Sequence, residues 1–254
     1  MISRNSSIYI IYKLLINCRS RFFYFLDYFG YIKQTYILKT KFGRIYCRPN
    51  TVDRWIATEN LILDQFDLRN FSNAKIETII DIGANIGTFT ILAKKIFPKA
   101  NIICIEPIHE NIIQLRKNLD LNKINDSSVK IIEAAITEKK SKKVKIYLNK
   151  NHASHSTEKD FIGSTGKSVL VKNINFSNLD QYIKGNTLVK IDIEGQEKYI
   201  IKSEYKKLLS LATVILLEFH DLPLQEKQLH EKFFRFIGYK NIKWNTDILI
   251  AKKF

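Results

Sequence analysis

Apolar residues are gathered into short, nearly continuous runs from Ile76 onward, and these runs are separated by stretches in which apolar residues recur every three or four positions. Runs and stretches that alternate in this way are typical of a parallel sheet covered by helices on both faces. The pattern therefore predicts an α/β fold. The runs that predict its strands are Ile76–Ile82, Asn101–Glu106, Val129–Ala135, Thr187–Ile193 and Thr213–Glu218.

Helices are predicted where the apolar spacing changes to three and four residues. Pro98 ends the first of them and Gly238 the last. Two further strands, 240–244 and 248–252, read as a hairpin at the end of the chain. We therefore expect a mostly parallel seven-stranded sheet with an antiparallel final hairpin and helices on both faces. The predicted helices are the residues from Gly87 to Phe97, then His109–Leu121, Ser177–Gly185 and Leu224–Ile237.

The first 74 residues carry a different pattern. The stretch from Ile8 to about Tyr31 predicts one long helix, and Thr35–Arg48 alternates in the manner of a β-hairpin. Asp53–Phe66 predicts another helix, on which Glu59 could face the cofactor or be solvated, and the solvated position is favoured. These elements are predicted to pack on a core domain that spans residues 75–254.

The helix predicted from Ile8 is both aromatic and basic, with Lys13, Arg19 and Arg21 among its tyrosines and phenylalanines. A helix of this composition can lie in a membrane interface, as a peripheral contact through residues 8–30. It can equally pack on the domain or on a partner subunit. The sequence leaves both interpretations open, and it leaves the oligomeric state open as well.

An insertion at about residues 142–175 departs from the alternation of strand and helix. Residues 142–149 and 167–176 each alternate like a strand, and a polar, glycine-containing loop with His152 and His155 joins them. A loop of this length predicts a flap that faces the substrate. The two histidines are interpreted as loop residues, because no third metal ligand is near them in the sequence. Ser177 and Asp180 predict a capping pair for the short helix that follows.

The strand at Ile76–Ile82 leads through a glycine turn into a helix, and the next strand ends at Glu106. A strand, a glycine turn, a helix and a second strand that ends in a carboxylate form the nucleotide-binding half of a doubly wound sheet. A dinucleotide fingerprint would require glycine at Asn85 and Thr88. The cofactor NAD is therefore disfavoured, and a ligand without phosphates fits better.

S-adenosylmethionine is such a ligand, and the turn offers groups for each of its polar parts. Its ammonium group needs acceptors, for which Asp81 and the turn carbonyls are candidates. Its carboxylate needs donors, for which the turn amides are candidates, and the two ribose hydroxyls can donate to Glu106. A purely structural glycine turn is the alternative interpretation.

Acidic residues end four of the predicted strands, and ligands of doubly wound sheets bind at these ends. Asp192, Glu194 and His220 are the candidates for the base that removes a proton from an acceptor hydroxyl. The same three residues can alternatively hold a divalent cation that lowers the pKa of the hydroxyl. Hydrogen bonding at a strand end is the competing interpretation for Glu218 and His220.

Composition narrows the class of protein only in part. The 254 residues carry a net charge of +16 and contain 45% hydrophobic residues, which is enough for a core. A basic chain can bind nucleic acid, an anionic membrane or an acidic substrate, but the excess of lysine here is interpreted mainly as compositional drift. The three cysteines are far apart, and neither a membrane-spanning run nor a signal peptide is recognised, so a cytoplasmic location is expected.

The segments DIGANIGTFT, CIEP, LDQYI, VKIDIEGQE and LLEFH together resemble the FkbM family of S-adenosylmethionine-dependent methyltransferases. The resemblance spans roughly residues 78–220 and implies a class I methyltransferase fold, which is Rossmann-like. It also implies O-methylation of a hydroxyl group, often that of a sugar in a polysaccharide, a glycolipid or a related natural product.

The resemblance implies roles for individual residues. Asp192 and Glu194 would form an acidic pair beside the transferred methyl group, with His220 as a further catalytic candidate. Asp192 would also contact the cofactor. Asp81, Gly83, Asn85 and Gly87 would line the methionine end of the cofactor, and Glu106 its ribose. Beyond the resemblance, Ala84, Pro107 and Ala135 are predicted as further cofactor contacts.

Two other functions compete with sugar O-methylation. An RNA methyltransferase would suit the positive charge, but the fourth strand ends in DIEG rather than in a proline-aromatic motif, and arginine is scarce. A nucleic acid partner is therefore disfavoured. A non-catalytic module that binds the cofactor or a membrane is the other alternative, and the intact acidic strand ends argue against it.

Overall fold

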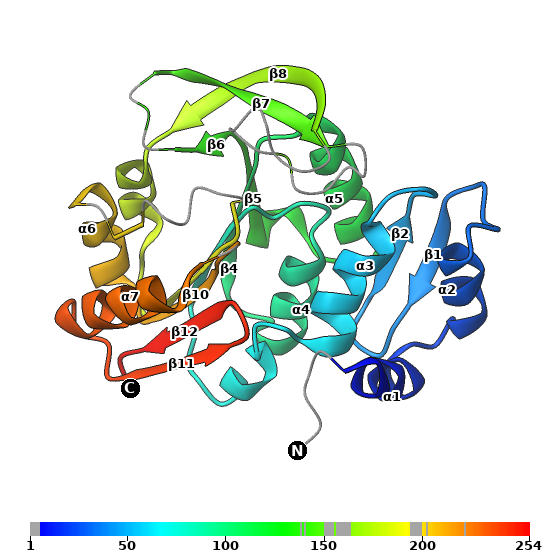
Figure 1. The fold of residues 1–254 in the computed structure, drawn as a ribbon, viewed down its shortest axis with the longest axis horizontal. Helices are drawn as coiled ribbons and strands as arrows, with labels where there is room; N and C mark the ends of the chain where they lie inside the picture. Colours follow the sequence, from blue (N-terminus) through cyan, green and yellow to red (C-terminus); the bar gives the residue numbers. More distant parts are fainter. Residues whose placement is uncertain are drawn as a thin grey trace.

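The computed structural model describes residues 6–137, 139, 141–149, 155, 164–193, 200–201, 203–220 and 222–254. A seven-stranded sheet forms the centre of the molecule (Figure 1), with the strand order β11-β12-β10-β9-β3-β4-β5. Its strands are β3 (Thr78–Ile82), β4 (Asn101–Glu106), β5 (Val129–Glu133), β9 (Thr187–Ile191), β10 (Val214–Glu218), β11 (Asn241–Asn245) and β12 (Ile248–Lys252).

Strand β12 runs antiparallel to both of its neighbours, and the remaining pairs in this sheet are parallel. The order reverses beside β3, which lies between β4 and β9. This arrangement confirms the predicted class I Rossmann-like fold. It also brings the carboxyl ends of β3, β4, β9 and β10 to one edge of the sheet, where ligands of such folds bind.

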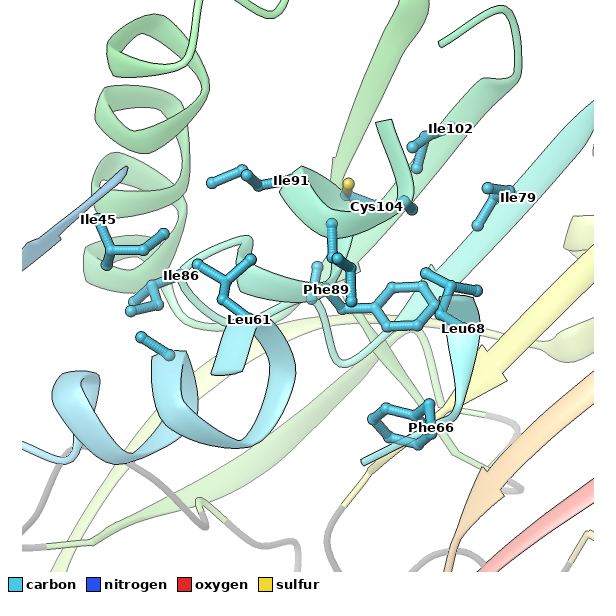
Figure 2. Packing of buried hydrophobic residues seen from close by; sticks show 14 of the residues in the cluster. Ile45, Leu61, Phe66, Leu68, Ile79, Ile86, Phe89, Ile91, Ile102 and Cys104 are labelled. Atoms are coloured by element: carbon cyan, nitrogen blue, oxygen red, sulfur yellow. The ribbon is translucent and has the colours of Figure 1, made fainter. Parts of the chain in front are cut away.

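Alternate residues of each strand face opposite sides of the sheet, and each side has its own core cluster. Ile79, Ile102 and Cys104 point toward helices α4 (Thr88–Ile96) and α5 (His109–Leu121). Figure 2 shows this side, where Phe89 and Ile91 of α4 lie among the strand residues and the labelled residues of the N-terminal part. The intervening residues of the same strands face α6 (Ser203–Leu211) and α7 (Leu224–Phe236).

The segment from Ile8 to about Tyr31, predicted as one helix, forms two helices. α1 (Ser7–Asn17) ends at Cys18, and α2 (Arg21–Tyr28) begins after Ser20. Between them the backbone N–H groups of Arg19 and Ser20 donate to the carbonyl oxygen of Lys39, at 2.8 and 3.3 Å. The linker therefore pairs with the predicted hairpin, β1 (Tyr36–Lys39) and β2 (Arg44–Cys47), and this pairing breaks the helix.

The helix predicted from Asp53 to Phe66 is also shorter than expected. α3 (Asp53–Ala57) continues into a π-helix, η1 (Thr58–Leu63), and ends at Asp64, whose φ is +56°. The carboxylate of Asp64 accepts hydrogen bonds from the backbone N–H groups that follow, where η2 (Leu68–Phe71) forms a 3₁₀ turn. The side chains of this N-terminal part share one core cluster with α4, α5 and the sheet.

The insertion forms a second, three-stranded sheet with the order β6-β8-β7. β7 (Lys143–Asn149) and β8 (Ser164–Ile174) confirm the predicted pair of alternating strands. The third strand of the main sheet is shorter than predicted, because Ala135 belongs to β6 (Ala135–Ile136), which pairs with β8. Of the predicted flap, His152 lies outside the described residues.

The remaining short elements are 3₁₀ turns, η3 (Asp126–Ser128) and η4 (Phe176–Tyr182). The predicted capping pair of η4, Ser177 with Asp180, is wrong, because Asn175 and Asn178 cap this turn reciprocally. The helical start lies one residue earlier than the sequence suggested, and this shift changes the capping residues. Within the described residues, no helix combines the length and the apolar character that crossing a membrane requires.

Candidate active site

Two pockets open at the carboxyl ends of the central strands, and they meet at the glycine turn after β3. Gly83, Asn85 and Asp192 line both of them. We call them the Glu106 pocket and the Glu218 pocket. The Glu106 pocket is lined by Ile82, Gly83, Asn85, Ile105, Glu106, Pro107, Ile108, Asn111, Ala134, Ala135, Ile136, Thr137, Ile146, His155, Asp192 and Ile193. The Glu218 pocket is lined by Val52, Trp55, Ile56, Glu59, Asn60, Gln65, Gly83, Ala84, Asn85, Thr88, Phe89, Lys190, Asp192, Glu218 and His220.

Gly83 holds the turn against the end of β9. Its φ is +78°, and a Cβ atom at this position would lie 1.8 Å from the carbonyl oxygen of Asp192. Only glycine combines this left-handed conformation with so close a backbone contact. The contact fixes the distance between the turn and Asp192, which form the boundary between the two pockets.

Four backbone N–H groups of the turn donate within the protein, so these four do not have the predicted role of donors to a ligand carboxylate. The N–H groups of Gly83 and Ala84 donate to the carbonyl oxygen of Ile105, at 2.9 and 3.0 Å. The N–H of Asn85 donates to Glu106 Oε2, and that of Gly87 to the carbonyl oxygen of Ala84. These bonds make the turn rigid. The carbonyl oxygens of Gly83, Ala84 and Ile86 also accept hydrogen bonds within the protein, so the side chain of Asn85 is the group that faces the pocket.

Glu106 is buried at the end of β4 and receives three hydrogen bonds. The Asn85 N–H donates to Oε2 at 2.9 Å, and the Ile108 N–H and Asn111 Nδ2 donate to Oε1 at 3.1 and 3.3 Å. A carboxylate offers about four acceptor positions, so Glu106 keeps capacity for a further donor. Burial raises the pKa of Glu106 to about 7, and the three hydrogen bonds oppose that rise.

Asn85 adds an unsatisfied acceptor to the same pocket. Its backbone is left-handed, with φ at +48°, a conformation that Asn adopts more readily than most residues. Its side-chain Oδ1 is buried and accepts no hydrogen bond from the part of the chain that the structure describes. A buried acceptor of this kind can take a hydrogen bond from a donor on a ligand.

Asp81 does not line either pocket, although the sequence placed it in contact with the cofactor. It is completely buried, and its Oδ2 accepts a hydrogen bond from Thr90 Oγ1 at 2.7 Å. Its Oδ1 lies 3.4 Å from Lys190 Nζ. Burial raises the pKa of Asp81, while the neighbouring ammonium of Lys190 and the Thr90 hydrogen bond oppose that rise. Asp81 therefore acts on the site through Lys190.

Lys190 is a site residue that the sequence analysis did not single out. It lies on β9 and is 3% exposed, and its ammonium group donates to the carbonyl oxygen of Gly83 at 2.8 Å. The same Nζ lies 3.2 Å from Asp192 Oδ2. Burial lowers the pKa of Lys190, but the carboxylates of Asp192 and Asp81 outweigh that effect and raise it. Lys190 thus holds the turn and Asp192 in a fixed relation.

Acidic side chains gather in the Glu218 pocket. Asp192 and Glu218 end neighbouring strands, and Glu59 reaches the same pocket from η1. Burial raises the pKa of Glu218 well above its usual range, and repulsion from the carboxylates of Asp192 and Glu59 adds to this effect. Glu59 is half-buried and lines the pocket, so the expectation that it is solvated is wrong.

The other predicted site residues line one of the two pockets, lie outside both linings, or fall outside the described residues. Pro107 and Ala135 line the Glu106 pocket, and Ala84 and His220 line the Glu218 pocket. Gly87 caps the start of α4 beside Leu115 and is not among the residues that line the two pockets. Glu194 lies outside the described residues. Within those residues, no three His, Cys, Asp or Glu side chains are arranged to hold a metal ion, so the predicted cation site stays a prediction.

Comparison with known proteins adds a family and a fold. The sequence model of the Vibrio cholerae RfbT protein family matches residues 9–235, which is most of the chain. The predicted resemblance to the FkbM family stays a prediction. No curated protein sequence matches the chain.

Several solved structures are similar in fold at low identity. A precorrin-6y C5,15-methyltransferase from Geobacter metallireducens is 14% identical with a TM-score of 0.42, over 74% of this chain and 87% of the other. An SAH-bound methyltransferase from Podospora anserina is 12% identical with a TM-score of 0.42, over 75% and 77% of the two chains. At these values the likeness transfers no activity to the chain.

Proposed function

The chain belongs to the family of the Vibrio cholerae RfbT protein, and on that premise we propose that it is an S-adenosylmethionine-dependent methyltransferase that methylates a sugar hydroxyl. The observation that carries the proposal is the pair of pockets that meet at Gly83, Asn85 and Asp192. Methyl transfer needs the donor and the acceptor on opposite sides of the transferred methyl group and in line with it. The two pockets offer that arrangement.

The residues of the Glu106 pocket suit S-adenosylmethionine. Glu106 can accept from ribose hydroxyls, and the buried Asn85 Oδ1 can accept from the ammonium of the methionine part. Pro107 and Ala135 offer apolar surface to an adenine ring. Among the described residues that line the pocket there is no lysine or arginine that would pair with a pyrophosphate, and this part of the lining favours the methionine cofactor over a dinucleotide.

When bound, S-adenosylmethionine supplies a methyl group whose carbon–sulfur bond breaks as the electron pair passes to sulfur. The protein must place an acceptor hydroxyl in line with that bond and remove its proton as the new carbon–oxygen bond forms. Asp192 faces both pockets and is placed to take the proton. Lys190 positions Asp192 through the 3.2 Å contact. Glu218 and His220 are placed to orient the acceptor or to receive the proton from Asp192.

The lining of the Glu218 pocket supports a sugar acceptor. Carboxylates of Asp192, Glu218 and Glu59 can accept hydrogen bonds from several hydroxyl groups at once. Trp55, which is 40% exposed, offers an aromatic face beside them. The same carboxylates would repel the phosphate groups of a nucleic acid, so this lining disfavours RNA as the acceptor.

A methyl-transfer assay tests the proposal. The purified protein is incubated with S-adenosylmethionine carrying a labelled methyl group and with a panel of mono- and oligosaccharides, and an RNA pool serves as the comparison. We expect label on at least one saccharide, resistant to the mild base that cleaves methyl esters, and none on RNA. Label on RNA alone, or on no acceptor despite confirmed cofactor binding, would contradict the sugar assignment.

A further inference from the structure

The N-terminal helices expose an unusual amount of apolar surface. Eleven of the twenty large apolar side chains that are exposed in the described part of the chain lie between Ile8 and Tyr31. They are Ile8, Ile11, Tyr12, Leu15, Ile16, Phe22, Phe23, Phe25, Tyr28, Phe29 and Tyr31. We call this set the N-terminal apolar surface.

On α1 the exposed residues Ile8, Ile11, Tyr12, Leu15 and Ile16 recur at helical spacing and form one stripe. A stripe of this kind ordinarily faces a core, but here it faces outward. α2 repeats the arrangement, with phenylalanines exposed every three or four residues. Exposed apolar side chains gathered in this way on two consecutive helices are typical of an interaction site.

Both helices are nevertheless fixed to the body of the protein. Asn17 Nδ2 at the end of α1 donates to the carbonyl oxygen of Ile62 at 2.9 Å. Asp27 of α2 accepts from Arg54 Nε of α3 at 3.1 Å, and Arg54 also lies 5.2 Å from the ring centre of Tyr28. The helices therefore pack on the domain through one side and present the apolar surface through the other.

Positive charge surrounds this surface. Residues 1–52 contain nine lysines and arginines and a single acidic residue, Asp27, so half of the net charge of +16 lies in the first fifth of the chain. Arg19, Arg21 and Lys33 are exposed next to the apolar residues. Apolar side chains bordered by cations are complementary to a lipid surface with anionic headgroups.

The Glu218 pocket continues toward this surface. A third pocket shares Trp55, Glu59, Gln65 and Glu218 with it and is completed by Tyr9 and Ile10 of α1, with residues 245–248 on the other side. The two pockets therefore form one groove that runs from Asp192 to α1. In Figure 1, α1 and α2 lie on the side of the view away from α6 and α7.

We propose that the N-terminal apolar surface docks the protein on an anionic membrane and that the groove receives an acceptor carried by a lipid of that membrane. The docking does not depend on the proposed function, whereas the assignment of the acceptor rests on it. Docking through α1 and α2 places the mouth of the groove beside the headgroups. A sugar attached to a lipid can then extend along the groove to Asp192 while its lipid stays in the bilayer.

Vesicle sedimentation with the full-length protein, without cofactor or acceptor, tests the docking. The vesicles are phosphatidylcholine alone and phosphatidylcholine with phosphatidylglycerol, each at low and high salt. We expect binding to the anionic vesicles that weakens as salt rises. The double variant Ile11→Asp/Leu15→Asp should bind at least about tenfold more weakly, because it removes apolar area and adds negative charge.

The matched control is Leu224→Asp/Leu229→Asp, which introduces the same charges at two exposed leucines of α7. It should bind vesicles as the wild type does, and thermal melting should show that both double variants are folded. Equal loss of binding in both variants, or no loss in either, would overturn the proposal. So would a wild type that forms a dimer, ignores all vesicles and becomes monomeric in Ile11→Asp/Leu15→Asp, because the surface would then bind a second copy.

Tryptophan fluorescence tests the orientation with α1 unchanged. The chain has two tryptophans, so Trp244→Phe leaves Trp55 at the groove, and Trp55→Phe leaves Trp244 in the core cluster on the other side of the sheet. Vesicles with brominated phosphatidylglycerol should quench Trp55 and leave Trp244 unquenched. Quenching of Trp244 alone, or of neither residue in bound protein, would overturn the proposed orientation. Neither measurement involves methyl transfer, so failure of the docking and failure of the proposed enzyme are distinguishable.

Discussion

The ammonium group of Lys190 lies 3.4 Å from Oδ1 of the buried Asp81, on the neighbouring strand of the sheet. The two residues are direct partners in the pairing of β3 with β9, and their other neighbours at this level are largely apolar. Lys190 also contacts Gly83 and Asp192. One buried cation therefore connects the two strands and the turn that form the boundary between the pockets.

Replacing Lys190 by Met should destabilise the protein by about 3–5 kcal/mol, because the substitution leaves the Asp81 carboxylate buried without its partner. The double variant Lys190→Met/Asp81→Asn should lose less stability, since it also removes the buried carboxylate charge that has no partner. Urea denaturation measures both. If Lys190→Met is as stable as the wild type, the ion pair has no part in holding the site.

Gly83→Ala should abolish cofactor binding, because its Cβ would lie 1.8 Å from the Asp192 carbonyl oxygen and force the turn and β9 apart. Gly30→Ala is the matched control, since Gly30 has a φ of +76° and no described residue beyond its two chain neighbours has an atom within 4 Å of its Cβ position. Both variants carry the same backbone strain, but only the first has the steric clash. Equal cofactor affinities in the two variants, measured by calorimetry, would show that the turn does not shape the site.

Cofactor affinity should rise with pH through about 7. In the free protein the pKa of Glu106 is raised to about 7 by burial, so the carboxyl is protonated at lower pH and ionised at higher pH. Ribose hydroxyls donate to the ionised form and favour it, so protonation of Glu106 competes with binding. In Glu106→Gln the affinity should be weaker and should no longer follow this titration. The affinity should be measured between pH 5.5 and 8.5, about 1.5 pH units to either side of this pKa. A wild-type affinity that stays constant over this range would be inconsistent with the proposed role of Glu106.

Asp192→Asn should lower kcat by about 10² to 10⁴-fold, as expected for loss of a general base, and should change cofactor affinity little. Asp120→Asn, which changes an exposed carboxylate on α5, should leave kcat unchanged. Glu218→Gln should raise the KM for the acceptor more than it lowers kcat, because Glu218 is placed to hold the acceptor. An Asp192→Asn enzyme with full activity would remove Asp192 from the mechanism.

The central strands of the sheet were predictable because they are buried on both faces. Val214–Glu218 is almost continuously apolar up to its terminal carboxylate, and such a run has few alternatives to a central strand. Helix His109–Leu121 was predicted to the residue, since its apolar spacing and its flanking residues agree. Where the apolar pattern and the burial of the element agree, the local sequence was sufficient to predict its type and its bounds.

The wrong or missing predictions concern residues whose structure depends on contacts with distant parts of the chain. The break at Cys18 depends on hydrogen bonds from Arg19 and Ser20 to Lys39, which lies about 20 residues away, and no local signal marks it. One feature of the sequence could have identified Lys190 as a site residue: it is a charged residue inside the otherwise largely apolar strand Thr187–Ile191. Its partner was not evident, because Asp81 lies more than 100 residues earlier and meets it only through the order of the strands.

Isothermal titration calorimetry tests whether the Glu106 pocket binds S-adenosylmethionine. The purified wild-type protein is titrated with S-adenosylmethionine, with S-adenosylhomocysteine and with NADH. We expect the two methionine cofactors to bind with a Kd of roughly micromolar order, no binding of NADH, and loss of the methionine cofactors in Gly83→Ala but not in Gly30→Ala. Binding of NADH alone, or methionine-cofactor binding that Gly83→Ala leaves unchanged, would contradict the assignment of the pocket.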